Sequence, residues 1–167
     1  MPKVKSATPL IFPYADRLPE EELQFMRMRN ALGLLARFYG FERIATPYVE
    51  DPAPYAAAIK AGLFEERVPL ICGSSSGGEV MVRSNVAVPV LRAYVTKKMN
   101  DLPHPLKFSL GGESVFLHGT AHTMRSTEEE GLLMIGEEGP IAEAEIVQII
   151  AKAVEELGIA PVRCQLA

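Results

Sequence analysis

The chain has 167 residues, of which 48% are hydrophobic and 23% charged, and a formal net charge of −4. This is typical of one globular domain that can bury a core, and no apolar run approaches the ~20 residues that a membrane helix needs. Residues 1–100 carry 13 Lys and Arg against 10 Asp and Glu, whereas residues 101–167 carry 4 against 11, so nucleic-acid binding by the acidic second part alone is disfavoured.

The first 18 residues have a broken apolar patch instead of the continuous apolar run of a signal peptide. We expect an irregular lead-in held by apolar anchors, which are Leu10, Ile11, Phe12 and Tyr14. Cys72 and Cys164 lie far apart without metal-ligand spacing. We therefore expect reduced thiols in a cytoplasmic protein.

A helix is predicted from Pro19 to about Tyr39, because proline suits the first helical position, acids follow it, and Gly40 is a natural C′ residue. Its apolar residues form two stripes, Leu23, Met26, Leu34 and Phe38 on one side and Phe25, Met28, Leu32 and Tyr39 on another. A helix that is apolar on two faces is usually covered on both. Two alternatives remain open: a fully buried core helix, or a helix between its own sheet and a partner subunit.

Residues 41–46 alternate like a strand, which Pro47 ends. Residues 52–67 suggest a short alanine-rich helix followed by a loop. Residues 68–72 and 79–83 flank the sequence GSSSGG, which predicts a hairpin. We interpret GSSSGG as a flexible turn and not as a phosphate-binding loop, because no Lys-Ser/Thr pair follows it and no helix begins there.

The next elements are a helix over 85–99 with Asn85 as its cap, and a stiff connector over 101–105. Residues 106–136 then form the central hairpin of the predicted sheet, with apolar runs at 106–117 and 132–135. Any active site is expected on this hairpin.

After the hairpin we predict a helix over 141–157, ended by Gly158, and a last strand over 162–166. The expected apolar face of that helix comprises Ala144, Val147, Ile150, Ala151 and Val154.

Other candidate sites on the hairpin have simple interpretations. His118 and His122 are four residues apart but lack a third ligand, so we interpret them as ordinary loop histidines and expect no metal. The acidic run over residues 128–130 could supply acid/base carboxylates, but we interpret it as a solvated face. We expect no cofactor.

The order of these elements and three quoted segments, GFERIATPYVED, LPHPLKFSLGGESVF and GPIAEAEIVQIIAKAVEELGI, resemble the class II aminoacyl-tRNA synthetase core. The most similar family is that of the histidyl-tRNA synthetases, including its regulatory paralogue in histidine biosynthesis. The resemblance implies one α+β domain over residues 1–167, with an antiparallel sheet flanked by helices. GFERIATPYVED resembles motif 1, which implies a homodimer. The implied interface residues are Phe25, Met28, Leu32, Ile44 and Pro47.

The family's substrate-binding residues are replaced here. The resemblance places Val115 at the motif 2 arginine that grips the ATP α-phosphate, a planar cation suited to charge developing at phosphorus. The glutamate that would hold a substrate ammonium becomes Asn85, and the family glutamine becomes Glu129. The remaining family site positions are occupied by Arg83, Ala87, Leu117, Thr123, Arg125 and Leu133. Arg83 matches the family, as do scaffold residues, and Arg125 keeps the basic character of the motif 2 loop.

We therefore expect a scaffold that has lost its chemistry, with no catalytic residues and doubtful ATP binding. Motif 3 and the anticodon-binding domain are expected to lie outside this sequence. The leading hypothesis is a noncatalytic, dimerising regulator that binds a protein partner, and tRNA binding by this chain alone is not expected. The alternatives are a histidine–tRNA ligase core that needs parts outside this chain, and a domain from a larger synthetase-like protein.

Overall fold

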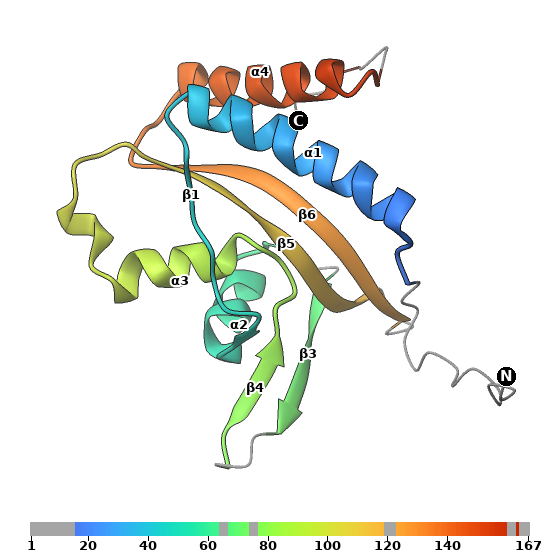
Figure 1. The fold of residues 1–167 in the computed structure, drawn as a ribbon. Helices are drawn as coiled ribbons and strands as arrows, with labels where there is room; N and C mark the ends of the chain where they lie inside the picture. The colour runs from blue at the N-terminus through green and yellow to red at the C-terminus, as the bar shows by residue number, and fades with distance from the viewer. Residues whose placement is uncertain (1–15, 64–66, 74–76, 119–122, 160–162, 164–167) are drawn as a thin grey trace, which may run out of the picture.

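The computed structural model describes residues 16–63, 67–73, 77–118, 123–159 and 163 (Figure 1). The α-helices in this part are α1 (Pro19–Phe38), α2 (Pro52–Lys60), α3 (Val88–Thr96) and α4 (Pro140–Glu156), with a 3-10 helix, η1, at Met99–Asp101. The strands are β1 (Glu42–Arg43), β2 (Val49–Glu50), β3 (Arg67–Gly73), β4 (Glu79–Val82), β5 (Leu106–His118) and β6 (Thr123–Ile135). None of the described helices is both long and apolar enough to cross a membrane.

The strands form one six-stranded sheet in the order β1-β5-β3-β4-β2, with β6 paired to β5. The predicted antiparallel sheet is confirmed for every pair except β1 with β5, which is parallel. The β5–β6 hairpin is its longest strand pair, with Leu106 opposite Ile135 and His118 opposite Thr123. The predicted central position holds for β5, which pairs with β1, β3 and β6, but among the described strands β6 pairs with β5 alone and lies at an edge. Figure 1 shows α1 and α4 side by side over one face of this hairpin, with α3 on the other side.

The predicted helices and the β3–β4 hairpin are confirmed because their signals are local. The first turn of α1 is held by the Leu18 N–H, which donates to Glu21 Oε2 at 2.9 Å. Gly40 follows α1 with φ +81°, a conformation that glycine adopts without strain. The helix predicted over 85–99 is shorter, and its N-cap is Ala87 and not Asn85. Asn85 lies two residues earlier, and its Oδ1 accepts from the N–H groups of Ala87 and Val88 at 3.0 and 2.8 Å.

The core between the helical layer and the sheet corrects the predicted face of α4. Its buried residues are Leu32, Ala36, Phe41, Ile149 and Ala153. The buried face of α4 thus contains Ala142, Ile149 and Ala153 instead of the predicted Ala144-centred face, and Ile150 is exposed. The predicted face and the buried face of α4 both consist of apolar residues, so the sequence pattern does not distinguish them. The packing of α4 against α1 decides which of the two faces is buried.

Two strand predictions are wrong in extent. The strand predicted over residues 41–46 is formed only at Glu42–Arg43, with one further hydrogen bond from the Ile44 N–H to the Ser109 carbonyl at 3.0 Å, and Phe41 lies in the core. The second strand of the central hairpin begins at Thr123 and not at Leu132. This strand includes the acidic run Glu128–Glu130, because arginines from other elements pair with its carboxylates.

The two apolar stripes of α1 have different surroundings, which contradicts the alternative of a fully buried helix. Leu32 lies in the core, whereas Leu23, Met26, Leu34 and Phe38 are all exposed, Leu34 at 71% and Phe38 at 83%. The predicted anchors at 10–14, the last strand at 162–166, His122 and Cys164 lie outside the described residues, as does part of the GSSSGG turn. Cys72 is a free, exposed thiol.

Candidate functional site

The candidate site lies on the face of the β5–β6 hairpin opposite α1 and α4. Successive strand residues alternate between faces, and contacts place Ser114 and Phe116 of β5 on the same face as Glu129 of β6. A cavity of about 560 Å³ is lined on this side by Asn85, Val86 and Ala87, and it continues past β6 to residues of α1 and α4, including Leu32 and Ala153.

Glu129 is the acidic group at the centre of this site, and the chain itself supplies its hydrogen-bond donors. Ser114 Oγ donates to Glu129 Oε2 at 2.8 Å, and the Val86 N–H donates to the same oxygen at 3.2 Å. The other carboxylate oxygen forms an ion pair with Arg67 Nη1. The Arg67 guanidinium also lies 4.8 Å from the centre of the Phe116 ring, so its position is fixed on two sides.

Arg83 binds protein groups and is only 6% exposed. Its Nε and Nη2 donate to the Glu113 carbonyl oxygen at 3.1 and 2.8 Å, and its guanidinium lies 5.5 Å from the centre of the Tyr48 ring. A Cβ on Gly112, whose φ is +133°, would come within 2.5 Å of Arg83 Nη2. Arg83 therefore joins the segment before β2 to β5 and stabilises the scaffold.

The structure brings together only some of the predicted site positions. Asn85, Ala87 and Glu129 lie around one cavity, and Leu133 packs on the neighbouring apolar cluster of Val86, Val90 and Leu110. Strand alternation places Val115 and Leu117 on the opposite face from Ser114 and Phe116. Thr123 and Arg125 are exposed at the far end of the hairpin.

The acidic run Glu128–Glu130 is not the solvated face that was predicted, since its side chains are only 5% to 17% exposed. On the α1 face, Glu128 pairs with Arg29 at 2.7 Å and Glu130 pairs with Arg43 at 2.5 Å. Sequence reasoning missed these arginines and Arg67. An available signal was the unusual placing of three consecutive acids within the best predicted strand segment.

The predicted interface residues also differ in their surroundings. Leu32 is buried in the chain's own core, and Ile44 packs against the cluster around Val86 and Leu110. Phe25 and Met28 are half-buried, and Pro47 is exposed. The exposed stripe of Leu23, Met26, Leu34 and Phe38 therefore offers more free apolar surface than these five residues do.

A second buried polar cluster lies beneath α2. Arg92 donates to both oxygens of Glu50, from Nε at 2.6 Å and from Nη2 at 2.9 Å. This hydrogen bond raises the pKa of Arg92. Burial, with a smaller contribution from Glu50, raises the pKa of Tyr55 above its ordinary value. Among the described residues no group of three or more His, Cys, Asp or Glu side chains could hold a metal ion.

Comparison with known proteins identifies the family. The family model described as histidyl-tRNA synthetase matches residues 14–167. The chain belongs to this family. A histidine–tRNA ligase of Pyrobaculum arsenaticum is 30% identical to it over 145 residues, which are 86% of this chain and 33% of that protein. An ATP phosphoribosyltransferase regulatory subunit of Oceanobacillus iheyensis is 28% identical over 145 residues, covering 85% of this chain and 34% of that protein.

Solved structures of the histidyl-tRNA synthetase family have the same fold. An ATP phosphoribosyltransferase regulatory subunit/histidyl-tRNA synthetase from Bacillus halodurans superposes with a TM-score of 0.76 at 18% identity, over 96% of this chain and 40% of that one. The apo histidyl-tRNA synthetase of S. aureus gives 0.69 at 22% identity, over 86% of this chain and 33% of that one. The chain thus spans about a third of the length of the curated relatives that it matches.

Proposed function

We propose that this histidyl-tRNA-synthetase-like domain is noncatalytic and acts in the cytoplasm as a dimerising regulatory module. The proposal rests on the hydrogen bonds that the Glu129 carboxylate already makes within the chain. Its carboxylate already accepts hydrogen bonds from Ser114, the Val86 N–H and Arg67. A substrate ammonium would have to displace these donors, and a buried carboxylate gains little from exchanging one cation for another.

The groups that adenylate formation needs are missing from the same site. The Asn85 side-chain oxygen accepts from the N–H groups of Ala87 and Val88 at the start of α3, and the Ala87 side chain has no polar group. Arg83 is bound to the Glu113 carbonyl, and Arg67 is bound to Glu129. The arginines that reach Glu129 and Glu113 on this face are therefore already paired, and the exposed Arg125, which lies opposite Phe116, is four residues further along β6 from Glu129. No arginine with free donors thus lies beside Glu129 among the described residues, where charge on a transferring phosphoryl group would need one.

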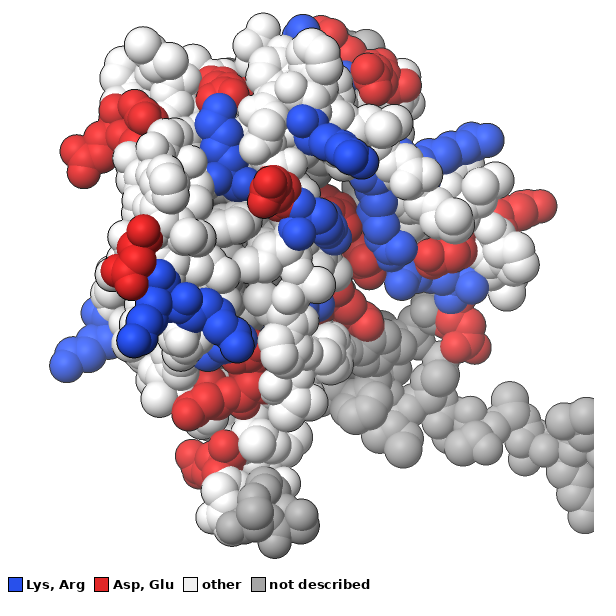
Figure 2. All heavy atoms as spheres, turned by 60° about the vertical axis from the view of Figure 1, so that its left-hand side comes forward, with Lys and Arg blue, Asp and Glu red and all other residues white. Residues whose placement is uncertain are grey.

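Relatives with a regulatory role support a protein partner. Two of the curated relatives, at 28% identity each, are ATP phosphoribosyltransferase regulatory subunits. We infer that this chain binds the catalytic subunit of an ATP phosphoribosyltransferase. Figure 2 shows acidic and basic side chains interspersed on one face of the molecule instead of a continuous basic surface, which does not favour tRNA as a partner.

The alternative is a histidine–tRNA ligase core that acts with parts outside this chain. It is supported by the identity with the Pyrobaculum arsenaticum ligase and by the partial coverage of that protein. In that case, the ligase would need Arg67 to leave Glu129 when histidine binds.

Histidine-dependent ATP–pyrophosphate exchange separates the two functions. We expect no exchange above background with this chain, and no thermal stabilisation by histidine. A bound ligand at 100 times its Kd would add about 2.7 kcal/mol to the free energy of unfolding. A full-length histidine–tRNA ligase is the positive control. Exchange that depends on histidine would overturn the noncatalytic proposal.

The proposed protein partner is tested by sedimentation velocity of this chain mixed with an ATP phosphoribosyltransferase catalytic subunit. Separate boundaries for the two proteins would contradict the proposed complex.

A further inference from the structure

The exposed side of α1 carries charged groups at both ends of its apolar stripe. Leu23 and Leu34 are 46% and 71% exposed, and they are about three helical turns apart. Glu20 lies about one turn before Leu23, and Arg37 lies about one turn after Leu34. These four side chains therefore form one row along the helix, which begins with an acid and ends with a base.

Neither charged end of this row has a partner among the described residues. Glu20 and Arg37 are both exposed, and no ion pair or side-chain hydrogen bond joins either of them to another described residue. The neighbouring acids differ, because Glu21 holds the first turn of the helix and Glu22 pairs with Arg29 at 3.5 Å. The row thus has an unneutralised negative charge at its beginning and an unneutralised positive charge at its end. Two copies of such a row are complementary when they run in opposite directions.

We propose that α1 packs against α1 of a second copy in antiparallel orientation, with Leu23 of each copy beside Leu34 of the other. In a two-fold interface each contact between two different residues occurs twice. The same register places Glu20 beside Arg37 of the second copy, because both lie one turn beyond the leucines. Two apolar contacts are then flanked by two ion pairs. This inference rests on the proposed dimer and adds the orientation and the register of its helices.

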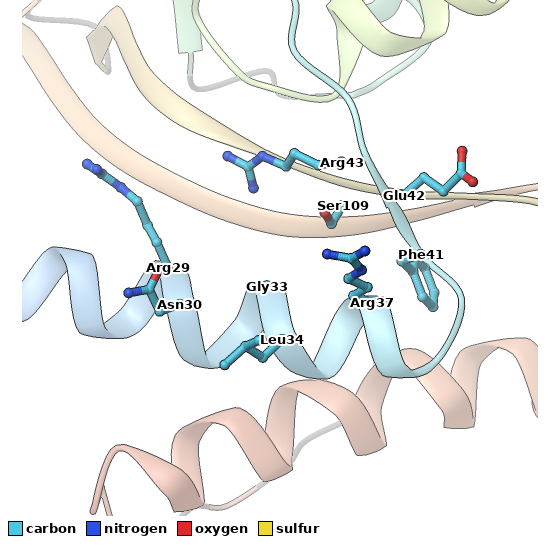
Figure 3. Close-up of a pocket in the computed structure, with 9 residues that line it drawn as sticks. All are labelled: Arg29, Asn30, Gly33, Leu34, Arg37, Phe41, Glu42, Arg43 and Ser109. Atoms are coloured by element: carbon cyan, nitrogen blue, oxygen red, sulfur yellow. The ribbon is translucent and has the colours of Figure 1, made fainter.

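A hollow beside the row has space for a side chain of the second copy. A cavity of about 530 Å³ between α1, β1 and β5 is lined by Asn30, Gly33 and Leu34, among other residues, and Figure 3 shows these three along the stretch of α1 that borders it. A Cβ added to Gly33 would meet nothing within 4 Å, so the helix surface is open there. In the proposed register, Met26 of the second copy lies between Asn30 and Leu34 along the helix axis. Met26 is 48% exposed in the single chain, and methionine adapts well to irregular gaps.

Disulfide cross-linking tests the register. The double variant Leu23→Cys, Leu34→Cys, in a chain that also carries Cys72→Ser and Cys164→Ser, should form a covalent dimer under mild oxidation, because each new thiol lies beside the other one across the interface. Within one helix the two positions are about 16 Å apart, which is too far for a disulfide. The single variants Leu23→Cys and Leu34→Cys are the matched controls. They should not cross-link, because like positions in this register are also about 16 Å apart along the axis.

Charge exchange tests the two ion pairs. Arg37→Glu should weaken the dimer by about threefold to tenfold in sedimentation equilibrium, because it places a like charge beside Glu20 of the second copy. The double variant Glu20→Arg, Arg37→Glu should restore the dissociation constant of the parent. Lys97→Glu is the control for the change in net charge, since Lys97 is an exposed residue at the end of α3. It should associate as the parent does.

The outcomes separate this pairing from the dimer itself. A parent that is monomeric at micromolar concentrations would overturn both, and would leave the stripe to a different protein. A dimeric parent whose double cysteine variant does not cross-link, or whose charge exchange restores nothing, would overturn this pairing alone. Cross-linking of the single cysteine variants would show parallel helices and would contradict the antiparallel register.

Discussion

Gly111 and Glu130 lie directly opposite each other on the β5–β6 hairpin, and a Cβ on Gly111 would come within 2.3 Å of the Glu130 carboxylate. That carboxylate is 5% exposed and is bound by Arg43. The glycine therefore makes room for a buried acid within the sheet. Gly111 on β5 thus leaves space for Glu130 on β6 to form its ion pair with Arg43 on β1.

The first prediction concerns this glycine. Gly111→Ala should lower the free energy of unfolding by about 1–3 kcal/mol, because the added methyl group must displace the Glu130 carboxylate from Arg43. Urea denaturation measures the change. Gly131→Ala is the control on the neighbouring strand, where an added Cβ meets nothing within 4 Å. It should cost nothing or stabilise by up to about 1 kcal/mol. Equal losses in the two variants would contradict the steric explanation.

The second prediction concerns the ion pair of Glu50 and Arg92. The Glu50 side chain is 3% exposed, so removing its partner leaves a buried charge unpaired. Arg92→Leu should therefore cost about 3 kcal/mol of unfolding free energy. The double variant Glu50→Gln, Arg92→Leu should recover part of this loss, since no unpaired charge remains. A double variant that is less stable than Arg92→Leu alone would disprove this account.

Much of the fold could be predicted from local signals. Pro19 with its following acids, Gly40 after α1 and Asn85 before α3 each act within a few residues of their own position. The GSSSGG sequence likewise predicts the β3–β4 hairpin without information from elsewhere in the chain. The family resemblance supplied a single antiparallel sheet flanked by helices, which local patterns do not contain, and the order of its strands came from the structure alone.

The missed features depend on residues that are far apart in the sequence. Glu128 and Glu130 look solvated until Arg29 and Arg43, which are 87 or more residues away, are placed beside them. The faces of the hairpin depend on its register, because a shift of one residue exchanges the two faces. An alignment without gaps could not show that Val115 and Glu129 point to opposite sides.

The third prediction concerns Tyr55, which is 1% exposed and whose hydroxyl has no hydrogen-bond partner among the described residues. Tyr55→Phe should leave stability at pH 7 unchanged or raise it by about 1 kcal/mol, since an unpaired buried polar group is removed. A loss of more than about 1 kcal/mol, measured by denaturation, would indicate a partner for this hydroxyl.

The same residue should make stability depend on alkaline pH. The pKa of Tyr55 is raised in the folded state by burial and by Glu50, so the unfolded state loses the phenol proton first as pH rises. The free energy of unfolding should then fall by up to about 1.4 kcal/mol per pH unit above about pH 10. Tyr55→Phe should have a flatter profile there, and identical profiles for parent and variant would rule out this contribution.

The fourth prediction tests the proposed dimer through the exposed stripe of α1. Leu34 and Phe38 are 71% and 83% exposed in the single chain, and they lie on the same helical face as Leu23 and Met26. If this stripe packs against a second copy, the double variant Leu34→Glu, Phe38→Glu should place buried charges in the interface and give a monomer. Each protomer should keep its own stability, because neither side chain belongs to the chain's core. Sedimentation equilibrium at micromolar concentrations gives the oligomeric state of parent and variant. Val95→Glu on α3, at a position that is 70% exposed, is the control and should sediment like the parent. A parent that is already monomeric, or a double variant that remains a dimer, would mean that this stripe is not the dimer interface.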